Sequence, residues 1–239
     1  MNNHDKIYDM FDRNSGAKPL ICVEMSGNHQ GSLDVAVEFA RSAKSAGADL
    51  LKVQVYKPDT ITFQSDFPDF KLSGDNDWVD YGTLYQLYEK AHTPWDWVAT
   101  IFTEAKKLDL PVFASPFDQT AVDFLEGLDC PIYKIASPEI TDVGLIEACA
   151  RTGKPIIMST GLASRTDLDD AVEVVRSYGV PMMILKCVSA YPTPIKDMNL
   201  ATIPWLKEVY GCSVGLSDHT LGPEASYAAT ALGATMIEK

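Results

Sequence analysis

Eight short apolar runs recur along the chain, and longer segments with a helical spacing of apolar residues separate them. Most of the runs are continuous stretches of Val, Ile, Leu and Met, at residues 20–25, 50–56, 111–114, 132–136, 155–159, 182–187, 212–216 and 234–238. Continuous runs of this length are typical of parallel strands that are buried on both faces. The pattern predicts eight buried parallel strands.

The intervening segments carry residues that begin and end helices. Ser32, Asp118 and Ser164 stand where a side chain can accept hydrogen bonds from the first turn of a helix. Gly47 and Gly179 stand where the helices that follow Ser32 and Ser164 are expected to end. Thr93-Pro94 and Gly222-Pro223 predict two further helix starts, because proline is favoured in the first turn.

Strands that alternate with helices eight times predict a (β/α)8 TIM barrel. We place it at residues 20–239, after an N-terminal extension at residues 1–19. A doubly wound open sheet is the alternative, but no glycine-rich nucleotide fingerprint follows the first strand. Because the sequence ends at the tip of strand eight, before any eighth helix, we expect a barrel that is truncated there.

The segment at residues 57–92 is much longer than the usual connection of about 2–6 residues between a strand and a helix. It contains a predicted short helix at residues 84–91, and four of its aromatic residues are Trp78, Tyr81, Tyr85 and Tyr88. In a barrel such an excursion lies on the catalytic face, so it is a candidate substrate lid.

Composition narrows the class of protein. The net charge of −13, with no basic stripe, argues against nucleic acid as a partner. No apolar run approaches the ~20 residues of a membrane helix, and the polar N-terminus does not resemble a secretory signal. We therefore expect a cytoplasmic protein, whose five widely spaced cysteines are reduced thiols.

Polar residues stand at the carboxyl ends of the predicted strands, where barrels carry out their chemistry. Lys52, Lys134 and Lys186 end strands two, four and six, and Glu238 ends strand eight. Side chains in one barrel layer come from alternate strands, so we expect the three lysines to converge and to face Glu238. One carboxylate cannot neutralise three buried lysines, which predicts a bound phosphate and carboxylate. In the alternative interpretation, some of the lysines point outward between the helices.

Seven motifs resemble the sialic acid (nonulosonate) synthase family in order and spacing, from about Leu20 to Lys239. They are Glu24-Met25-Ser26-Gly27-Asn28-His29, Lys52-Val53-Gln54, Ser115-Pro116-Phe117-Asp118, Tyr133-Lys134-Ile135-Ala136-Ser137-Pro138-Glu139, Ser159-Thr160-Gly161, Lys186-Cys187-Val188-Ser189-Ala190-Tyr191-Pro192 and Gly215-Leu216-Ser217-Asp218-His219-Thr220. Within the family the motifs look most like the pseudaminic acid synthases, with the N-acetylneuraminate synthases as the nearest competitor.

The resemblance implies an enzyme that condenses phosphoenolpyruvate with an open-chain N-acylated amino sugar, such as a 2,4-diacetamido-hexose or N-acetylmannosamine. The product would be a nine-carbon nonulosonic acid, and phosphate would be released. A divalent cation, typically Mn²⁺, would polarise the sugar aldehyde. The full-length protein is expected to be a homodimer.

The resemblance also implies roles for residues. Glu24 and Glu238 would organise water and proton transfer, and His219 would be a metal ligand, although a lone histidine at a strand end is more often a polar contact. Phosphoenolpyruvate would be held by Lys52, Ser115, Lys134, Ser137, Ser159, Lys186, Ser189, Tyr191 and Ser217.

The sequence departs from the family in two respects. A second metal histidine would follow Lys239 directly, and a C-terminal antifreeze-like domain would follow the barrel; neither is in the sequence. We therefore expect this 239-residue chain to bind Mn²⁺ weakly. The N-acetylneuraminate branch has His and Asn around strand six, where this chain has Lys186 and Ser189.

Three other interpretations remain open at this point. The chain could be a different phosphoenolpyruvate aldol synthase, although no additional arginine cluster offers a second phosphate site. It could be a Schiff-base aldolase with Lys134 or Lys186 as the nucleophile. It could also be a truncated, inactive barrel that binds ligands.

Overall fold

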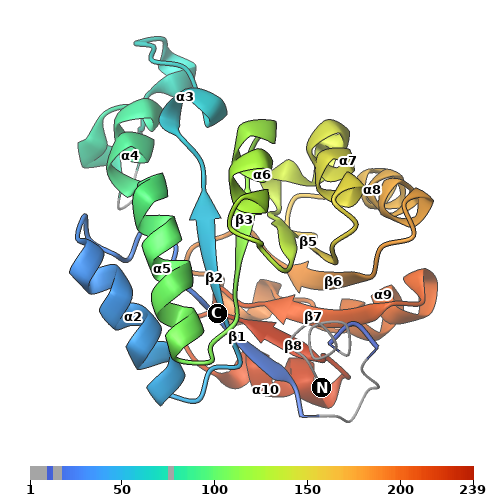
Figure 1. Ribbon diagram of the computed structural model, residues 1–239. Coiled ribbons are helices and arrows are strands. Elements are labelled where there is room, and N and C mark those ends of the chain that lie inside the picture. Colours follow the sequence, from blue (N-terminus) through green and yellow to red (C-terminus); the bar gives the residue numbers. More distant parts are fainter. Residues whose placement is uncertain (1–9, 13–17, 75–77) are drawn as a thin grey trace.

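Eight parallel strands close into a barrel in sequence order, which confirms the predicted TIM fold. The computed structural model describes residues 10–12, 18–74 and 78–239 (Figure 1). The strands are β1 Leu20–Glu24, β2 Leu50–Val55, β3 Val112–Pro116, β4 Tyr133–Ile135, β5 Ile156–Ser159, β6 Met182–Cys187, β7 Ser213–Ser217 and β8 Met236–Glu238. β1 pairs with β8 as well as with β2, so no strand edge is left open.

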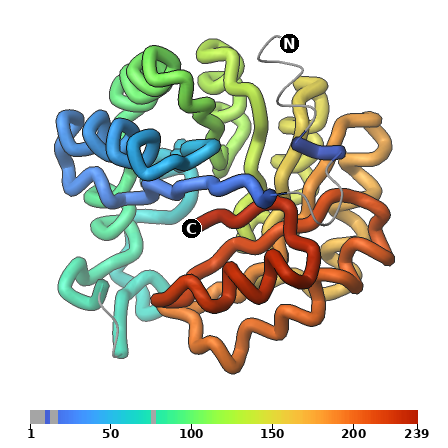
Figure 2. Tube along the Cα trace, turned by 90° about the horizontal axis from the view of Figure 1, so that it is seen from below, coloured from blue at the N-terminus to red at the C-terminus, as the bar shows by residue number. Residues whose placement is uncertain are grey.

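Helices lie around the strands (Figure 1), and Figure 2 shows the same chain from below. They are α2 Leu33–Ser45, α3 Pro58–Ile61, α4 Leu84–Ala91, α5 Trp95–Lys107, α6 Gln119–Glu126, α7 Val143–Arg151, α8 Arg165–Ser177, α9 Thr202–Tyr210 and α10 Glu224–Ala231. Four short 3-10 helices are η1 Pro68–Phe70, η2 Val79–Tyr81, η3 Pro138–Thr141 and η4 Ile195–Asp197. No helix in these described ranges has the length and apolar character needed to span a membrane.

The predicted helix caps are confirmed. Ser32 accepts from Val35 N, Asp118 accepts from Thr120 N and Ala121 N, and Ser164 accepts from Asp167 N. The prolines differ slightly from the prediction. Pro94 and Pro223 occupy the N-cap positions of α5 and α10, so each lies one residue before its helix.

The long excursion between β2 and α5 lies beyond the tip of β2 in Figure 1. It contains α3, η1, η2 and α4, and the predicted short helix at residues 84–91 is confirmed as α4. An antiparallel bridge between Lys71 and Thr83, with a hydrogen bond from Leu72 N to Gly82 O, ties its middle together. Its role as a substrate lid stays a prediction.

The opposite end of the barrel is covered by part of the predicted N-terminal extension. Met10 and Phe11 are buried with the core, and Ser213 Oγ at the start of β7 donates to Phe11 O over 2.8 Å. Residues 1–9 and 13–17 lie outside the described residues. The thiol prediction is confirmed, since all five cysteines are free and four of them are buried.

Candidate functional site

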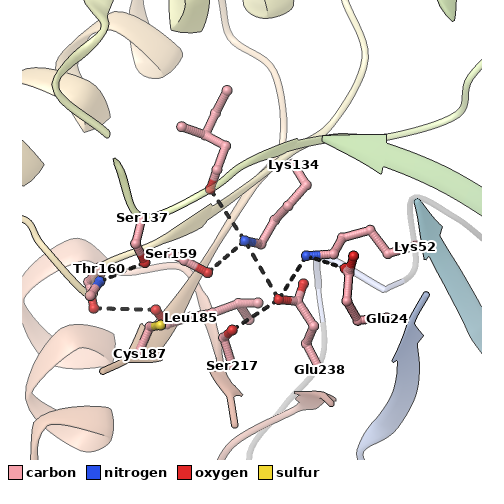
Figure 3. Close-up of polar contacts among 12 residues, drawn as sticks. Glu24, Lys52, Lys134, Ser137, Ser159, Thr160, Leu185, Cys187, Ser217 and Glu238 are labelled. Carbon is pink, nitrogen blue, oxygen red and sulfur yellow. Dashed lines mark hydrogen bonds and ion pairs between the residues drawn. The ribbon is translucent and has the colours of Figure 1, made fainter. Parts of the chain in front are cut away.

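A buried ion-pair network lies inside the barrel, with Glu24 and Glu238 at the carboxyl ends of β1 and β8 and Lys52 and Lys134 within β2 and β4 (Figure 3). Lys52 Nζ lies 2.6 Å from Glu24 Oε2 and 3.0 Å from Glu238 Oε1. Lys134 Nζ lies 3.7 Å from the same Glu238 oxygen. The side chains of both lysines and of Glu238 are 5% exposed or less, so water screens these charges only weakly.

Two serines complete this network from β5 and β7. Lys134 Nζ donates to Ser159 Oγ over 2.6 Å, and Ser217 Oγ donates to Glu238 Oε1 over 2.9 Å. The structure thus brings together Glu24, Lys52, Lys134, Ser159, Ser217 and Glu238, all of which the sequence had singled out. Their roles in catalysis stay predictions.

The charge balance differs from the expectation of three lysines facing one acid. Glu24 and Glu238 together pair with Lys52 and Lys134, so this group carries no net charge when all four are ionised. The sequence argument missed the pairing because Glu24 is on β1 and not on an even strand. An anion is therefore not needed to make the two lysines tolerable in the interior.

The expectation that Lys186 joins this layer is wrong, because the strand register turns it to the other face. Cys187 pairs with Ser217, whose hydroxyl reaches Glu238 inside the barrel. Neighbours in a parallel ladder share a face and successive residues alternate, so Cys187 points inward and Lys186 outward. Lys186 is half-buried, and its Nζ donates to Cys187 O over 2.8 Å. Its role in binding phosphoenolpyruvate stays a prediction.

Burial and neighbouring charges shift the pKa values of Lys134 and Glu238 in the network. Burial lowers the pKa of Lys134 to about 8, although Glu238 opposes this shift. Burial would raise the pKa of Glu238, but the charges of Lys134 and Lys52 outweigh it and hold that pKa well below its usual range. Glu238 is therefore a fixed carboxylate at neutral pH.

Hydroxyl groups gather around Gly161, beside the network. Gly161 N donates to Ser137 Oγ over 2.9 Å. A Cβ at Gly161 would lie 2.7 Å from Ser137 Oγ and would overlap Ser189 Oγ, so only glycine lets these two hydroxyls approach the backbone here.

Two of the predicted serines have buried oxygens without a hydrogen-bond partner in the described part of the chain. They are Ser115 Oγ on β3 and Ser189 Oγ after β6. A buried hydroxyl without a partner costs free energy, so such atoms call for an explanation, and a bound ligand supplies one.

Glu139 belongs to the same end of the barrel and was not assigned a role from the sequence. It lies in η3 directly after β4, and its Oε2 is buried without a hydrogen-bond partner among the described residues. Burial raises its pKa to about 7, although the charge of Lys134 opposes the shift. The signal in the sequence was its place two residues after Ser137, but only the fold shows its burial.

His219 and Tyr191 lie at the rim. His219 Nδ1 is 2.9 Å from Val188 O, and because a carbonyl can only accept, this contact places a proton on Nδ1, so that in the neutral ring Nε2 keeps its lone pair. The rings of Tyr191 and His219 lie 4.3 Å apart. His29, at the end of β1, accepts from Gly31 N and contacts Ala91 O, which makes it a structural residue of the loop.

A metal centre is only partly supported. His219 Nε2 is suited to a divalent cation, since the carbonyl bond to the other nitrogen orients the ring. Within residues 10–12, 18–74 and 78–239, however, no group of three or more His, Cys, Asp or Glu side chains is placed to hold a metal ion. The described residues therefore do not form a metal site by themselves.

Known proteins are similar to this chain in sequence and in fold. Residues 39–239 match the NeuB family model. The pseudaminic acid synthase of Helicobacter pylori is 48% identical over 222 residues, which cover 92% of this chain and 65% of that protein. The pseudaminic acid synthase of Campylobacter jejuni subsp. jejuni serotype O:23/36 is 44% identical over 227 residues, which cover 95% and 66%. This chain thus spans about 65% of the length of these relatives.

A solved structure of a related protein has a similar fold. The N-acetylneuraminic acid synthetase of Leptospira borgpetersenii serovar Hardjo-bovis, in complex with citrate, superposes with a TM-score of 0.81 at 31% identity. The match covers 93% of this chain and 73% of that one. On sequence and on structure, the chain belongs to the NeuB family.

Proposed function

We propose that the protein condenses phosphoenolpyruvate with an N-acylated amino sugar to form a nonulosonic acid and inorganic phosphate. The observation that carries the proposal is the buried Lys52–Glu24–Glu238–Lys134 network beside the unpartnered serine hydroxyls. It combines two ion-paired lysines with serine hydroxyls that lack a hydrogen-bond partner among the described residues, and barrels carry out their chemistry at the carboxyl ends of their strands. Membership of the NeuB family and the pseudaminic acid synthase relatives support the proposal.

Phosphoenolpyruvate fits the polar floor of this site. The ammonium groups of Lys52 and Lys134 would face its phosphate and carboxylate, and the hydroxyls of Ser115 and Ser189 would donate to their oxygens. Ser137 would contribute from the Gly161 backbone, to which it is already bonded. Lys52, Lys134 and Ser137 are held by their contacts before the substrate arrives, which limits the entropy lost on binding.

The reaction balances without an oxidant or a covalent intermediate on the protein. A bond forms between C3 of phosphoenolpyruvate and the aldehyde carbon of the sugar. The electron pair for it comes from the C2–C3 double bond, which becomes a single bond, and the aldehyde oxygen takes a proton. Water adds its oxygen to C2, the bond from C2 to the phosphate oxygen breaks as C2 becomes a ketone, and the second proton of the water leaves with the phosphate. The proton lost by the water replaces the proton given to the aldehyde oxygen.

Glu139 is our candidate for carrying that proton. Its pKa of about 7 lets it give and take a proton near neutral pH, whereas the low pKa of Glu238 prevents this. Glu238 Oε2 has no hydrogen-bond partner among the described residues. With Glu24, it would orient the attacking water and hold the two lysines in place.

A divalent cation, Mn²⁺ in the prediction from the sequence, would polarise the aldehyde when bound. The residues described here offer it one imidazole, His219, so no step above depends on it. A titration with Mn²⁺ that follows the His219 ring signals by NMR would test this assignment independently of activity.

A Schiff-base aldolase is the second candidate, because the lowered pKa of Lys134 also suits a nucleophilic amine. Its Nζ is engaged by Ser159 and Glu238, which opposes attack on a carbonyl. Borohydride reduction in the presence of both substrates distinguishes the two. The proposed function predicts an unchanged protein mass, and an adduct on Lys134 would support the aldolase.

Binding of phosphoenolpyruvate tests the proposed site directly. Lys134→Ala should abolish the heat of binding in calorimetry, because a desolvated contact to the anion is lost and Glu238 loses a partner. Lys154→Ala is the control, since Lys154 is also an ion-paired lysine, partly buried, but precedes β5 at the opposite end of the barrel. Equal affinity in the Lys134 variant and the unmutated protein would contradict the assignment.

A further inference from the structure

Three aromatic side chains, His219, Tyr191 and Trp78, contact one another in series between the rim of the site and the long excursion after β2, and we call them the aromatic ladder. Tyr191 packs on His219 with ring centroids 4.3 Å apart, and Trp78 packs on Tyr191 in a T-shaped arrangement at 6.4 Å. Trp78 remains 44% exposed and Tyr191 60% exposed. Two large aromatic side chains therefore present apolar surface to solvent beside a polar, charged floor.

Both residues are held by their own loops. Tyr191 precedes Thr193, whose N–H donates to His219 O over 2.9 Å and whose hydroxyl donates to Ala190 O over 2.7 Å. Trp78 is the N-cap of η2, and its carbonyl accepts from Tyr81 N over 3.0 Å. The ladder thus has a defined position relative to the site.

The chemistry of the two co-substrates assigns them to different ends of this site. The face of an aromatic ring carries partial negative charge and repels an anion, so phosphoenolpyruvate is favoured at the lysines and serines. An acylated amino sugar is neutral, with C–H faces and acyl methyl groups that pack well against aromatic rings. The ladder is therefore suited to the sugar.

Resting on the proposed function, we propose that Trp78 is a specificity-determining residue for the amino sugar. With Tyr191 it forms an aromatic wall that contacts acyl substituents remote from the reacting carbon. Trp78 packs against Tyr191, which packs against His219, and no ring contact joins Trp78 to His219 among the described residues, so we place Trp78 against a substituent of the sugar and not at its reacting carbon. The wall favours a sugar with two acylamino groups over a sugar with one.

The test measures phosphate release in the presence of Mn²⁺, with a 2,4-diacetamido-hexose and with N-acetylmannosamine. Trp78→Ala should raise KM for the diacetamido sugar about tenfold, the loss expected for one aromatic contact. KM for phosphoenolpyruvate and kcat should stay within about twofold, and N-acetylmannosamine should be affected less. Trp78→Leu, which keeps apolar bulk without the ring, should raise the same KM several-fold and serves if the alanine variant does not fold.

Trp205→Ala is the matched control, because Trp205 is 40% exposed but lies on α9 and packs against Tyr210. It should leave both sugar KM values unchanged. If the unmutated protein turns over and Trp78→Ala keeps its KM for the diacetamido sugar, the inference is wrong while the proposed function stands. If the unmutated protein releases no phosphate with either sugar, the proposed function fails and the inference with it.

Discussion

At the scale of single residues, the site contains two glutamates whose surroundings drive their pKa values apart. Glu238 Oε1 faces two lysine ammonium groups, whereas Glu139 is partly buried and has one buried oxygen that lacks a hydrogen-bond partner in the described chain. Such a divergence is typical of enzymes that need one fixed carboxylate and one proton carrier. Neither role follows from residue type, because both residues are glutamates at strand ends.

The pH dependence of the reaction tests the role of Glu139. Burial raises its pKa to about 7, so the acid form that would donate the proton is lost as the pH rises through that value. We therefore expect kcat/KM to fall above about pH 7, which forms the alkaline limb of the pH profile. Glu139→Gln should lower kcat by about 10²-fold or more and remove the limb.

The same shift has a consequence for stability that can be measured without substrate. Because the folded pKa lies above the ordinary value of 4.5, the free energy of unfolding decreases as the pH rises from about 4.5 to about 7. Glu139→Gln should remove this part of the pH dependence. A variant that keeps both the kinetic limb and the stability slope would show that another group titrates there.

At the scale of elements, the loop after β5 brings the serines of two neighbouring loops together. Ser137 follows β4, Ser189 follows β6, and Gly161 lies between them after β5. The amide of Gly161 also fixes the Ser137 hydroxyl. This close approach is possible only because position 161 has no side chain.

Gly161→Ala should therefore disable the site while leaving the barrel folded. The added Cβ would displace Ser137 Oγ and overlap Ser189 Oγ, so we expect affinity for phosphoenolpyruvate to fall by about tenfold or more, measured by calorimetry. Gly144→Ala is the control, because Gly144 lies in the first turn of α7 and its nearest contact would be an ordinary 3.4 Å. It should be neutral or slightly stabilising. Equal phosphoenolpyruvate affinity in both variants would argue against a binding role for these serines.

Much of the fold could be predicted at this scale, and part of the site could not. The eight strands, the helix caps and α4 follow from local patterns of apolar and capping residues. Lys186 was misplaced because its face depends on whether Cys187 or Lys186 pairs with Ser217, and this register is set by packing around the whole barrel. Glu24 was not expected in the lysine layer for a different reason: the layer was predicted from the even strands, whereas the Glu24 carboxylate reaches Lys52 from β1.

At the scale of the whole molecule, the two ends of the barrel differ in the side chains that they carry. The carboxyl ends of the strands carry the charged network and the rim of aromatic side chains. The opposite end is closed by Met10 and Phe11, which are each 9% exposed and belong to the core. In barrel enzymes the carboxyl ends of the strands carry the chemistry and the opposite end contributes stability, and the charged network and the buried Met10 and Phe11 follow the same division.

Phe11 allows this division to be tested. Phe11→Ala removes an aromatic ring from the closed end, where Ser213 Oγ also holds the Phe11 carbonyl, so the free energy of unfolding should fall by about 2 kcal/mol. Urea denaturation measures the change, and Asp12→Ala is the matched control because Asp12 is the exposed neighbour. Since no residue of the candidate site touches Phe11 in the contacts described, affinity for phosphoenolpyruvate should be unchanged in both variants. A Phe11 variant with native stability, or with weakened phosphoenolpyruvate binding despite a folded barrel, would show that the two ends are not independent.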